Sequence, residues 1–418
     1  MTEGTTRLRA ITLAITLLLA GVHVLDAQSR DLHYYLNTGE TNSPLLKDYA
    51  NQLLTAKVDS AKVLAELKPQ VNALSQVLIA PTAHNFGYDS SLTNGGNYSA
   101  LVGATLPFLN RRIRQGRFGA IAVRNQGVRA NAAISVLELK QRITDQYILT
   151  YADQRQVAFS RTLFDLLDRE GQALEQLVAK GVYMQTDLLT LRVNKRAQSI
   201  AIEQATAFYR RDLYALDQLC GITDTVSATL TDPGLVVPPA FDLGKSPVWQ
   251  QFLIDSLANE SDKLLVDLNY RPRLSSFADA GFMSSSFRKV PDHFGTSFGL
   301  NFAMPIYDGK QRKLEHDRIA LREETRKNYK DFYTLQFRQH AAQLRESLLR
   351  SNKLLADLQD QLAQEDKLIA LFQIEIEKGI ARITDLFLVL ANHAATQNAL
   401  ILAETDQHRI INEMNYLK

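Results

Sequence analysis

Two stretches of the chain carry the same polar residues at the same spacing, and they contain its best candidates for functional side chains. KGVYMQTDLL begins at Lys180, and KGIARITDLF begins at Lys378. Glycine readily adopts the positive φ of a tight turn, and threonine or aspartate can cap a helix that restarts after a turn. These residues predict turns, helix caps and local negative charge. Ordinary helix caps without any partner remain the simpler alternative. The candidates are Gly181, Thr186, Asp187, Gly379, Thr384 and Asp385.

The sequence contains no recognisable set of catalytic or cofactor-binding residues. Its eight histidines form no HExxH motif or paired spacing, and neither a GxSxG motif nor a phosphate-binding loop occurs. Cys220 is the single cysteine, so an intrachain disulfide and a multi-cysteine metal site are both excluded. We therefore predict a protein that is not an enzyme and has no cofactor and no metal ligands.

The second of these stretches follows a strand that runs directly into a long helix. From Phe298 to Ile306, apolar residues alternate with small or polar ones, which is typical of a strand with one apolar face. Pro305 ends the strand because it has no N–H to donate, and Asp308-Gly309 forms a turn. Neither proline nor glycine occurs again before Gly379. The pattern predicts an uninterrupted helix of about 70 residues.

The same order of strand, proline and helix occurs once before, in residues 97–112 around Pro107. Pro107 and Pro305 are 198 residues apart, and so are Lys180 and Lys378. The helix openings at Pro44 and Pro247 are 203 residues apart, as are Pro69 and Pro272. Ordered landmarks at two fixed offsets predict an internal duplication. We expect repeats at 28–246 and 247–418, with strand-to-helix junctions at Pro107, Pro305 and Gly309.

Each repeat is predicted to contain a helix, two strands, a long helix and a returning helix. The polar residues 31–42 are expected to precede the first helix without regular structure. The expected helices are 44–68, 111–179, 186–220, 247–270, 310–377 and 384–417, and the expected strands are 71–80, 97–108, 273–283 and 296–306. We expect each long helix to lie beside two shorter helices that follow one another end to end.

The long helix of the second repeat carries a seven-residue apolar repeat. Leu348, Leu355, Leu362, Ile369 and Ile376 follow one another at this spacing. Such a repeat is typical of coiled-coil packing rather than of a globular core. Ser351 and Glu365 interrupt the alternate apolar positions. The seam is therefore expected to be only partly buried, as in helices curved into an open cylinder.

The N-terminus has the pattern of a secretory signal peptide, predicted as residues 1–27. Arg7 and Arg9 precede a mostly apolar run from Ala10 to Leu25, and Ala27 is a small residue at the expected cleavage site. A transmembrane anchor is the alternative, but the run is shorter than the roughly 20 residues that a spanning helix needs. No later segment resembles a transmembrane helix, so any further entry into a membrane would use strands.

The four predicted strands have the length that crosses an outer membrane when tilted. Four strands cannot close a barrel, because closed barrels need about eight. An open sheet edge in lipid leaves backbone groups without hydrogen bonds, at a cost of several kcal/mol each. The chain is therefore expected to assemble, and strand counting allows either two or three copies.

The duplicated strand-proline-turn-helix segments, the paired Gly-x-x-x-x-Thr-Asp-Leu motifs and the signal peptide resemble the TolC family of outer-membrane efflux proteins. The resemblance covers about residues 43–417. It implies a mainly α-helical fold with a membrane β-barrel portion, in which a homotrimer forms a 12-stranded barrel that continues into a periplasmic α-barrel of 12 helices. It also implies a location in the outer membrane, with helices extending into the periplasm.

The resemblance further implies partners and a passive exit duct in a tripartite efflux or type I secretion system. A periplasmic adaptor protein would dock at the tip turns, and an inner-membrane pump would supply the energy. Asp385 matches a position that lines the closed aperture, where threefold symmetry would create a ring of carboxylates. Arg382 is a further aperture candidate, but a well-known relative has its arginine at the position of Ala381. Leu388 stands where some relatives carry a second acidic residue, so their closing network does not transfer intact.

Two other functions are alternatives to the exit duct. A periplasmic coiled-coil scaffold or adaptor without a pore is the rival function, although it has no need of four membrane-length strands. An envelope enzyme is the more distant rival. Two matching basic clusters are expected to be solvated helix faces, with contact to lipid phosphates at the inner leaflet as the alternative. They are Arg111, Arg112, Arg114 and Arg117 in the first repeat and Lys310, Arg312 and Lys313 in the second. The net charge of +2 gives no support for nucleic-acid binding. Drugs, metal ions and a secreted polypeptide all remain open as cargo.

Overall fold

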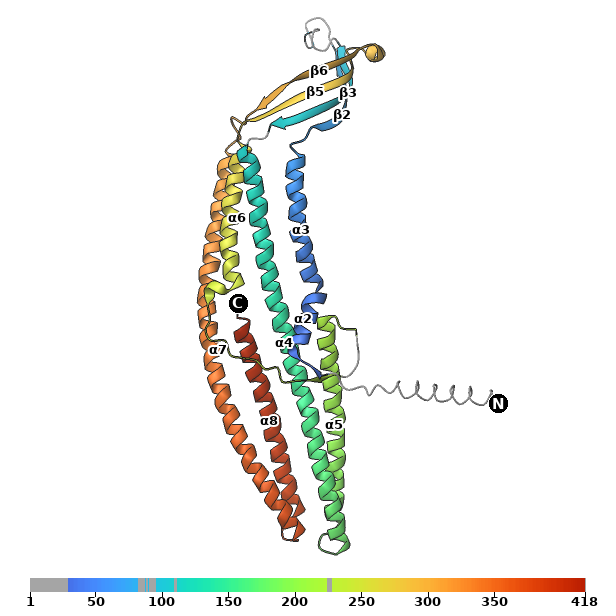
Figure 1. Cartoon of the computed structure of the whole chain (residues 1–418), viewed down its shortest axis with the longest axis vertical. Coiled ribbons are helices and arrows are strands. Elements are labelled where there is room, and N and C mark those ends of the chain that lie inside the picture. The colour runs from blue at the N-terminus through green and yellow to red at the C-terminus, as the bar shows by residue number, and fades with distance from the viewer. Residues whose placement is uncertain are drawn as a thin grey trace, which may run out of the picture. The chain divides into compact units, whose positions relative to one another are not determined.

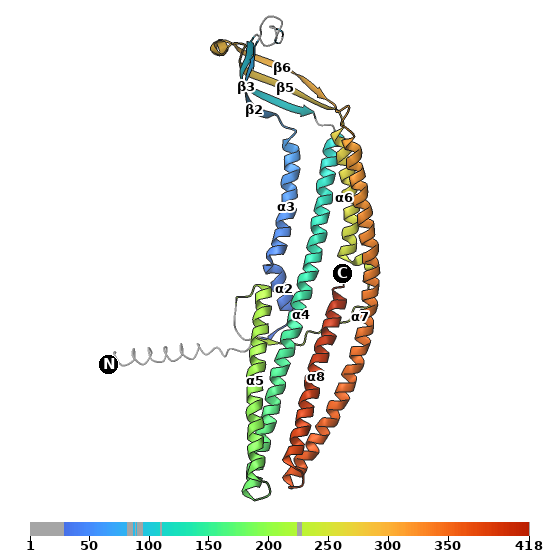
Figure 2. The same ribbon diagram turned by 180° about the vertical axis from the view of Figure 1, so that it is seen from behind.

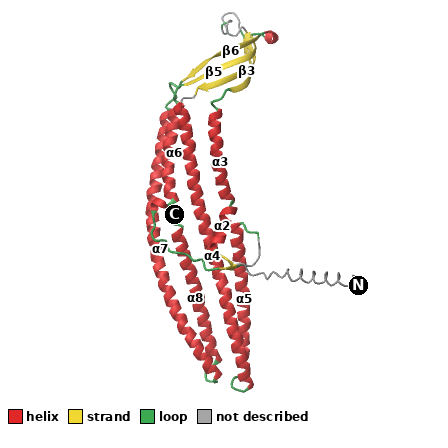
Figure 3. Cartoon of the chain, viewed as in Figure 1, coloured by secondary structure: helices red, strands yellow, loops and turns green. Residues whose placement is uncertain are grey.

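The protein is described here from a computed structural model, which describes residues 29–81, 87, 89, 95–108, 111–223 and 228–417. The predicted signal peptide lies outside the described residues. Most of the described chain is helical, and the few strands belong mainly to a single sheet (Figure 3). This composition agrees with the predicted mainly α-helical class.

The chain divides into two compact units, each built from segments of both predicted repeats. Of the described residues, the sheet unit comprises those within Leu45–Ile134 and Asp242–Gln336. The helical unit comprises those from residue 29 to Pro44 and within Ser135–Phe241 and Phe337–Leu417. Two helices are long enough to contribute to both units, namely α4 (Arg111–Ala179) and α7 (Gln311–Glu377). The bounds of α4 are those expected from sequence, and those of α7 differ by one residue.

The sheet unit holds four antiparallel strands in the order β2-β3-β5-β6. Their bounds are Gln70–Ala80 for β2, Gly95–Phe108 for β3, Arg273–Ser284 for β5 and Phe294–Ala303 for β6. The unit also contains α3 (Pro44–Ala65), α6 (Pro247–Asn269) and the short 3-10 helices η1 (Leu243–Lys245) and η2 (Phe287–Asp292). Each of these four strands adjoins a helix in the sequence. Strands β2 and β5 follow α3 and α6, whereas β3 and β6 lead into α4 and α7.

Local sequence explains where the sheet-unit helices begin. At α6, Pro247 occupies the first turn and the hydroxyl of Ser246 accepts a hydrogen bond from the Trp249 N–H at 3.3 Å. A serine cap followed by proline satisfies one orphan donor of the first turn and presets the helical φ. At α7, the carboxylate of Asp308 accepts hydrogen bonds from the N–H groups of Lys310 and Arg312, at 2.9 and 2.8 Å.

The helical unit is built from two antiparallel hairpins, α4 with α5 (Gln185–Cys220) and α7 with α8 (Ile383–Asn415) (Figures 1 and 2). The hairpins are tied together on their polar sides. The side-chain amide of Asn412 on α8 donates to the carboxylate of Asp145 on α4 at 2.7 Å, and Arg155 on α4 forms an ion pair with Glu404 on α8. The apolar seam expected on α7 is confirmed at four of its five positions. Leu355, Leu362, Ile369 and Ile376 are buried against α8 or the tip core, whereas Leu348 is only partly buried.

A helix that the sequence did not predict completes this unit. Residues 31–42 form α2 (Leu32–Asn42), which begins at a cap where the carboxylate of Asp31 accepts from the Tyr34 N–H at 2.8 Å. Tyr35 is fully buried beside the ring of Tyr147. The short strand β1 (Ser29–Arg30) precedes α2 in the chain and pairs in parallel with β4 (Thr229–Leu230), which follows α5. The expectation of an irregular segment was wrong because tertiary packing, rather than helix propensity, stabilises α2.

Two further expectations need correction. Strand β6 ends at Ala303, so Met304, Pro305 and Ile306 lie beyond it rather than in it. Judged by length and composition alone, α8 is apolar enough to cross a membrane, although no such segment was expected after the N-terminus. Leu386, Val389 and Leu390 of α8 are buried in a core shared with the other hairpin helices. We therefore assign its apolar character to packing, because core helices pass the same test.

Candidate functional site

The two tip turns of the helical hairpins have the same backbone geometry. Gly181 and Gly379 have φ values of 76° and 73°. In the first turn, the Gly181 N–H donates to the Val178 carbonyl at 2.9 Å and the Val182 N–H donates to the Leu177 carbonyl at 3.0 Å. The second turn repeats both bonds around Gly379. This pair of bonds defines a Schellman motif, in which glycine relieves the steric cost of a left-handed residue.

The acidic residues of the two tips are used differently. The side chain of Asp187 accepts a hydrogen bond from the Met184 N–H at 3.0 Å, so it closes the first turn of α5. Asp385 is exposed, and within the described chain its carboxylate has neither a hydrogen bond nor an ion pair. The N-cap residues are Met184 and Arg382, not the threonines or aspartates that the sequence offered as caps. Thr186, Thr384 and Arg382 are exposed. Helix capping therefore accounts for the presence of Asp187. The carboxylate of Asp385 has no such role within the described chain and can interact with a group outside it.

Tyr183 connects the two tips. Its hydroxyl lies 2.7 Å from the carbonyl oxygen of Ala381 and 3.2 Å from that of Ile376, and it can donate to either. Burial raises the pKa of Tyr183, so the phenol remains a donor at neutral pH. A Cβ added at Gly379 would lie 2.7 Å from Cγ1 of Val182, so the turns also touch through apolar atoms. The sequence does not predict this link. Tyr183 has no counterpart in the second tip, where alanine occupies the equivalent position.

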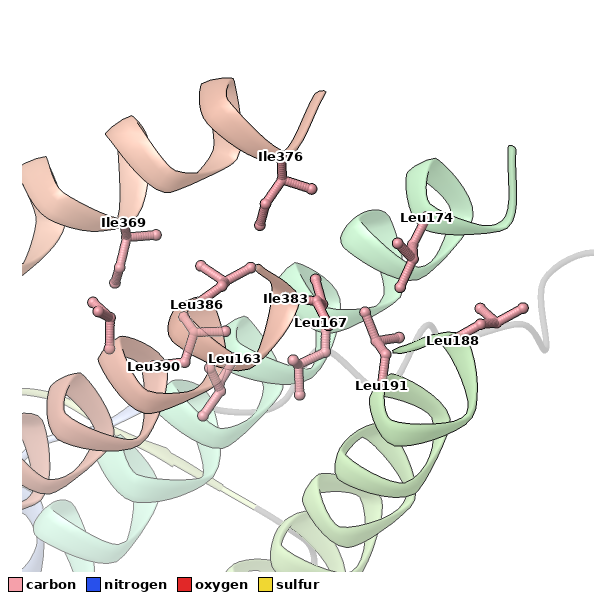
Figure 4. Packing of buried hydrophobic residues seen from close by; sticks show 11 residues of the cluster. Leu163, Leu167, Leu174, Leu188, Leu191, Ile369, Ile376, Ile383, Leu386 and Leu390 are labelled. Atoms are coloured by element: carbon pink, nitrogen blue, oxygen red, sulfur yellow. The ribbon is translucent and has the colours of Figure 1, made fainter. Parts of the chain in front are cut away.

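A single apolar cluster fills the tip region behind the turns (Figure 4). Its members come from all four helices of the two hairpins, and they point towards one another between the ribbons. Leu174 is fully buried, and Leu191, Ile383 and Leu386 are each only 1% exposed. The two hairpin ends therefore share one core. The cluster contains Leu163, Leu167, Leu174, Leu188, Leu191, Ile369, Ile376, Ile383, Leu386, Val389 and Leu390.

The sheet of the other unit has one predominantly apolar face and one mixed face, on which polar residues stand beside apolar ones such as Leu74 and Phe277. Directly paired residues of an antiparallel ladder lie on the same face, so the register assigns every position. Phe302 pairs with Leu274, and Leu274 pairs with Phe108 on β3. This face carries no charged residue, and Phe298 on it is 90% exposed. The opposite face carries Asn301. The apolar face comprises Val71, Ala73, Val77, Ile79, Tyr98, Ala100, Val102, Ala104, Leu106, Phe108, Leu274, Ala278, Ala280, Phe282, Phe294, Phe298, Leu300 and Phe302, interrupted only by small or hydroxyl residues.

The predicted junction residues lie where strands give way to helices. Pro107 lies within β3, opposite Ser275 and beyond the last position at which β3 pairs with β2. Its missing N–H therefore costs no hydrogen bond on that side. Pro305 lies two residues after β6. Gly309 has φ 66°, and Lys310 beside it has φ 72°, so consecutive left-handed residues turn the chain into α7.

Just after the junction at Pro305 and Gly309, polar and charged side chains connect α6 to α7. The guanidinium of Arg312 bonds to the carboxylate of Asp267 at 2.7 Å and holds the pKa of that carboxyl below its usual range. Further down, Arg326 bonds to Glu323 at 2.6 Å and lowers the Glu323 pKa to about 2. Asn259 of α6 donates to the same Glu323 at 2.9 Å. These contacts fix α6 against the start of α7.

A carboxyl pair lies between α4 and α5, with Asp153 partly buried and Asp212 buried. Burial, followed by a hydrogen bond with Asp212, raises the pKa of Asp153 to about 7. Asp212 is almost completely buried, and the Arg211 guanidinium holds its pKa below the usual range. Asp153 is therefore the group of this pair that holds a proton below about pH 7, while Asp212 stays ionised beside Arg211. Across the described residues, no group of three or more histidine, cysteine or acidic side chains is arranged to hold a metal ion.

Solved structures that superpose on this chain include outer-membrane channels. The outer-membrane channel OprN superposes with a TM-score of 0.70 at 15% identity, covering 92% of this chain and 89% of that chain. The outer membrane protein VceC from Vibrio cholerae gives 0.69 at 12% identity, with 92% and 95% covered. The CmeC outer membrane channel of Campylobacter jejuni gives 0.69 at 11% identity, with 92% and 85% covered.

At these identities the comparisons establish a shared fold. The predicted resemblance to TolC-family outer-membrane proteins is confirmed at that level, over nearly the whole chain. No family model matches the sequence, and no characterised protein matches it in a sequence comparison.

Proposed function

We propose that this protein is the outer-membrane exit duct of a tripartite efflux or type I secretion system, through which substrates leave passively. The observation that carries the proposal is the amphipathic sheet, with one uncharged apolar face exposed over four strands. In water such a face would be an aggregation hazard, whereas in lipid it is stabilising. The likeness to known outer-membrane channels supports the same conclusion.

The sheet edges support assembly into a closed barrel. Strands β2 and β6 are the outer strands of the four, so each has one edge without a partner among the described strands. Pairing β6 of one copy with β2 of the next would remove these edges, as a membrane requires. We propose a homotrimer with 12 strands, as the family resemblance implies. Exposed apolar residues on α5 and α8, among them Val193, Ile200 and Leu402, would give neighbouring copies a surface to cover.

The element order supports the proposed internal duplication. Helix, strand, strand, long helix and returning helix follow one another twice, as α3-β2-β3-α4-α5 and as α6-β5-β6-α7-α8. We propose that 28–246 and 247–418 descend from one ancestral repeat and that residues 1–27 direct export. The periplasmic tips, with Gly181, Thr186, Asp187, Gly379, Thr384 and Asp385, would dock a periplasmic adaptor that connects to an inner-membrane pump.

Asp385 is the favoured aperture residue, with Arg382 beside it. Its carboxylate is exposed and has no partner in the described chain, whereas Asp187 is engaged in its own turn. Three Asp385 carboxylates converging on a threefold axis would attract cations. Replacing Asp385 with alanine should weaken block by divalent cations and raise closed-state conductance in planar bilayers. Asp187→Ala is the matched control, because it should loosen the α5 cap without changing cation block. Unchanged block in Asp385→Ala would remove Asp385 from the aperture.

The rival function is a periplasmic scaffold or adaptor without a pore. The two functions predict different locations for the same full-length chain. An exit duct should be recovered from the outer-membrane fraction as an oligomer that resists heat and detergent. A scaffold should be recovered from the soluble periplasm. Recovery of a soluble monomer would overturn the proposed duct and favour the rival.

A further inference from the structure

Exposed cations follow the strand ends on the side of the sheet where the helices begin. Phe108, Leu274 and Phe302 are in register across β3, β5 and β6, so they mark one end of the sheet. Arg111 and Arg114 lie in the first turn of α4, just beyond β3. Lys310 and Lys313 lie at the start of α7, beyond β6. All four are exposed.

The carboxylates near this end are already engaged within the chain. Arg117 forms an ion pair with Glu66, and Asp308 accepts from two N–H groups at the start of α7. The remaining pairs here are Asp267 with Arg312 and His316, and Glu315 with Arg318. The next exposed carboxylate on α7, Asp317, lies roughly 10 Å further along the helix than Lys310. The four exposed cations therefore produce a local excess of positive charge.

Strongly exposed apolar side chains lie beside these cations. Ile306 is 95% exposed and Tyr307 is 84% exposed, in the segment between β6 and α7. Leu314 is 63% exposed in the first turn of α7. Tyrosine is enriched where a protein crosses from hydrocarbon to water, because its ring is apolar and its hydroxyl is polar. In a lipid interface, cations can contact the headgroups while neighbouring apolar side chains enter the hydrocarbon. A water-filled lumen would suit the cations and leave the apolar side chains in water.

We propose that Arg111, Arg114, Ile306, Tyr307, Lys310 and Lys313 form an interface surface that binds the headgroups of anionic phospholipids in the periplasmic leaflet. The inference rests on the proposed insertion of the sheet in the outer membrane. The lysines and arginines contact lipid phosphates, while Ile306 and Tyr307 enter the adjoining hydrocarbon boundary. This surface fixes the depth of the sheet in the membrane.

Lipid retention by the full-length protein tests this surface. The protein is reconstituted in vesicles of phosphatidylethanolamine containing about one quarter phosphatidylglycerol, extracted gently, and its bound lipids are counted by native mass spectrometry. In the wild type, the ratio of phosphatidylglycerol to phosphatidylethanolamine among the retained lipids should be roughly fivefold above that ratio in the vesicle. The preference should disappear in about 1 M salt, where charges are screened within about 3 Å.

A charge-matched pair of variants separates this surface from general electrostatics. The variant Arg111→Gln, Arg114→Gln, Lys310→Gln, Lys313→Gln should lose the preference. The control Arg161→Gln, Arg196→Gln, Lys353→Gln, Lys367→Gln removes the same charge from exposed positions of the helical unit and should keep it. An interface variant that retains phosphatidylglycerol like the wild type would overturn the inference. Tyr307→Ser should also lower retention. If Tyr307→Ser dissociates the oligomer with retention unchanged, another copy covers this surface instead.

The same samples distinguish failure of the inference from failure of the proposed function. Both variants should conduct in planar bilayers like the wild type. If the wild type conducts but shows no preference for phosphatidylglycerol, the proposed lipid-binding surface is wrong and the proposed duct stands. If the wild type retains phosphatidylglycerol but never conducts, the proposed duct is wrong and the lipid-binding surface stands.

Discussion

At the scale of single residues, Tyr183 is the side chain that most directly links the two tip turns. Tyr183→Phe keeps the ring and removes the hydroxyl that bonds to the Ala381 or Ile376 carbonyl. A hydrogen bond of this kind contributes about 0.5–1.5 kcal/mol. We expect faster hydrogen exchange at the amides of Gly379 and Ile380, with unchanged exchange in the middle of α8. Tyr214→Phe, at a half-exposed position of α5, is the control and should change neither region. Equal exchange in Tyr183→Phe and wild type would contradict the link.

The Asp153–Asp212 pair makes a prediction about pH. The pKa of Asp153 rises from 3.8 to about 7 on folding, mainly through burial. The folded chain therefore binds more protons than the unfolded chain between these values, and this contribution to stability falls as the pH rises through that window. Asp153→Asn keeps a neutral hydrogen-bonding group at every pH. Its thermal midpoint should vary less than that of the wild type between about pH 4 and about pH 7.

Exposed Asp165, also on α4, provides the control for this pH profile. Asp165→Asn should leave the profile of the wild type unchanged. If Asp153→Asn and the wild type lose stability in parallel as the pH rises, Asp153 is not the group that titrates.

At the scale of elements, the register of β6 predicts opposite outcomes for neighbouring substitutions. Phe302 lies on the apolar face with Leu274, and Asn301 lies on the opposite, mixed face with Ser275. Phe302→Arg would place a charge on the lipid-facing side near one end of the sheet, where the cost is below the roughly 2–4 kcal/mol expected at the midplane. Asn301→Arg should be tolerated. Oligomer yield in the outer-membrane fraction measures both, and equal loss for the two variants would contradict the assignment of faces.

How much of each element the sequence predicts depends on where its stability originates. The bounds of α4 and the paired turns at Gly181 and Gly379 were predictable because periodicity and glycine are local signals. Helix α2 was not, because its fully buried Tyr35 depends on Tyr147, more than 100 residues away in the chain. Tertiary packing, rather than the local helix propensity of the sequence, therefore stabilises α2.

The functional candidates follow the same division. The motif found both aspartates, but only the structure distinguishes Asp187, which caps α5, from the unengaged Asp385. The contacts of Tyr183, and those of Arg312 with Asp267, depend on the register between helices. No sequence pattern specifies that register. The end of β6 at Ala303 was missed because alternation continues in the sequence after pairing stops.

At the scale of the whole molecule, the two kinds of surface call for two environments. The sheet unit exposes an uncharged apolar face, whereas the hairpins of the helical unit carry exposed ion pairs such as Arg192 with Glu175. A chain with both surfaces fits a protein that crosses a membrane with strands and extends into water with helices. This combination, together with the shared fold, underlies the proposed exit duct.

Single-channel recording tests that claim most directly. Full-length protein purified as an oligomer from the outer-membrane fraction would be added to a planar lipid bilayer at fixed voltage. The proposed duct predicts stepwise current increases, each marking the insertion of one oligomer, with Phe302→Arg reducing the insertion rate. A stable oligomer that inserts and never conducts, or a chain recovered only as a soluble monomer, would contradict the duct.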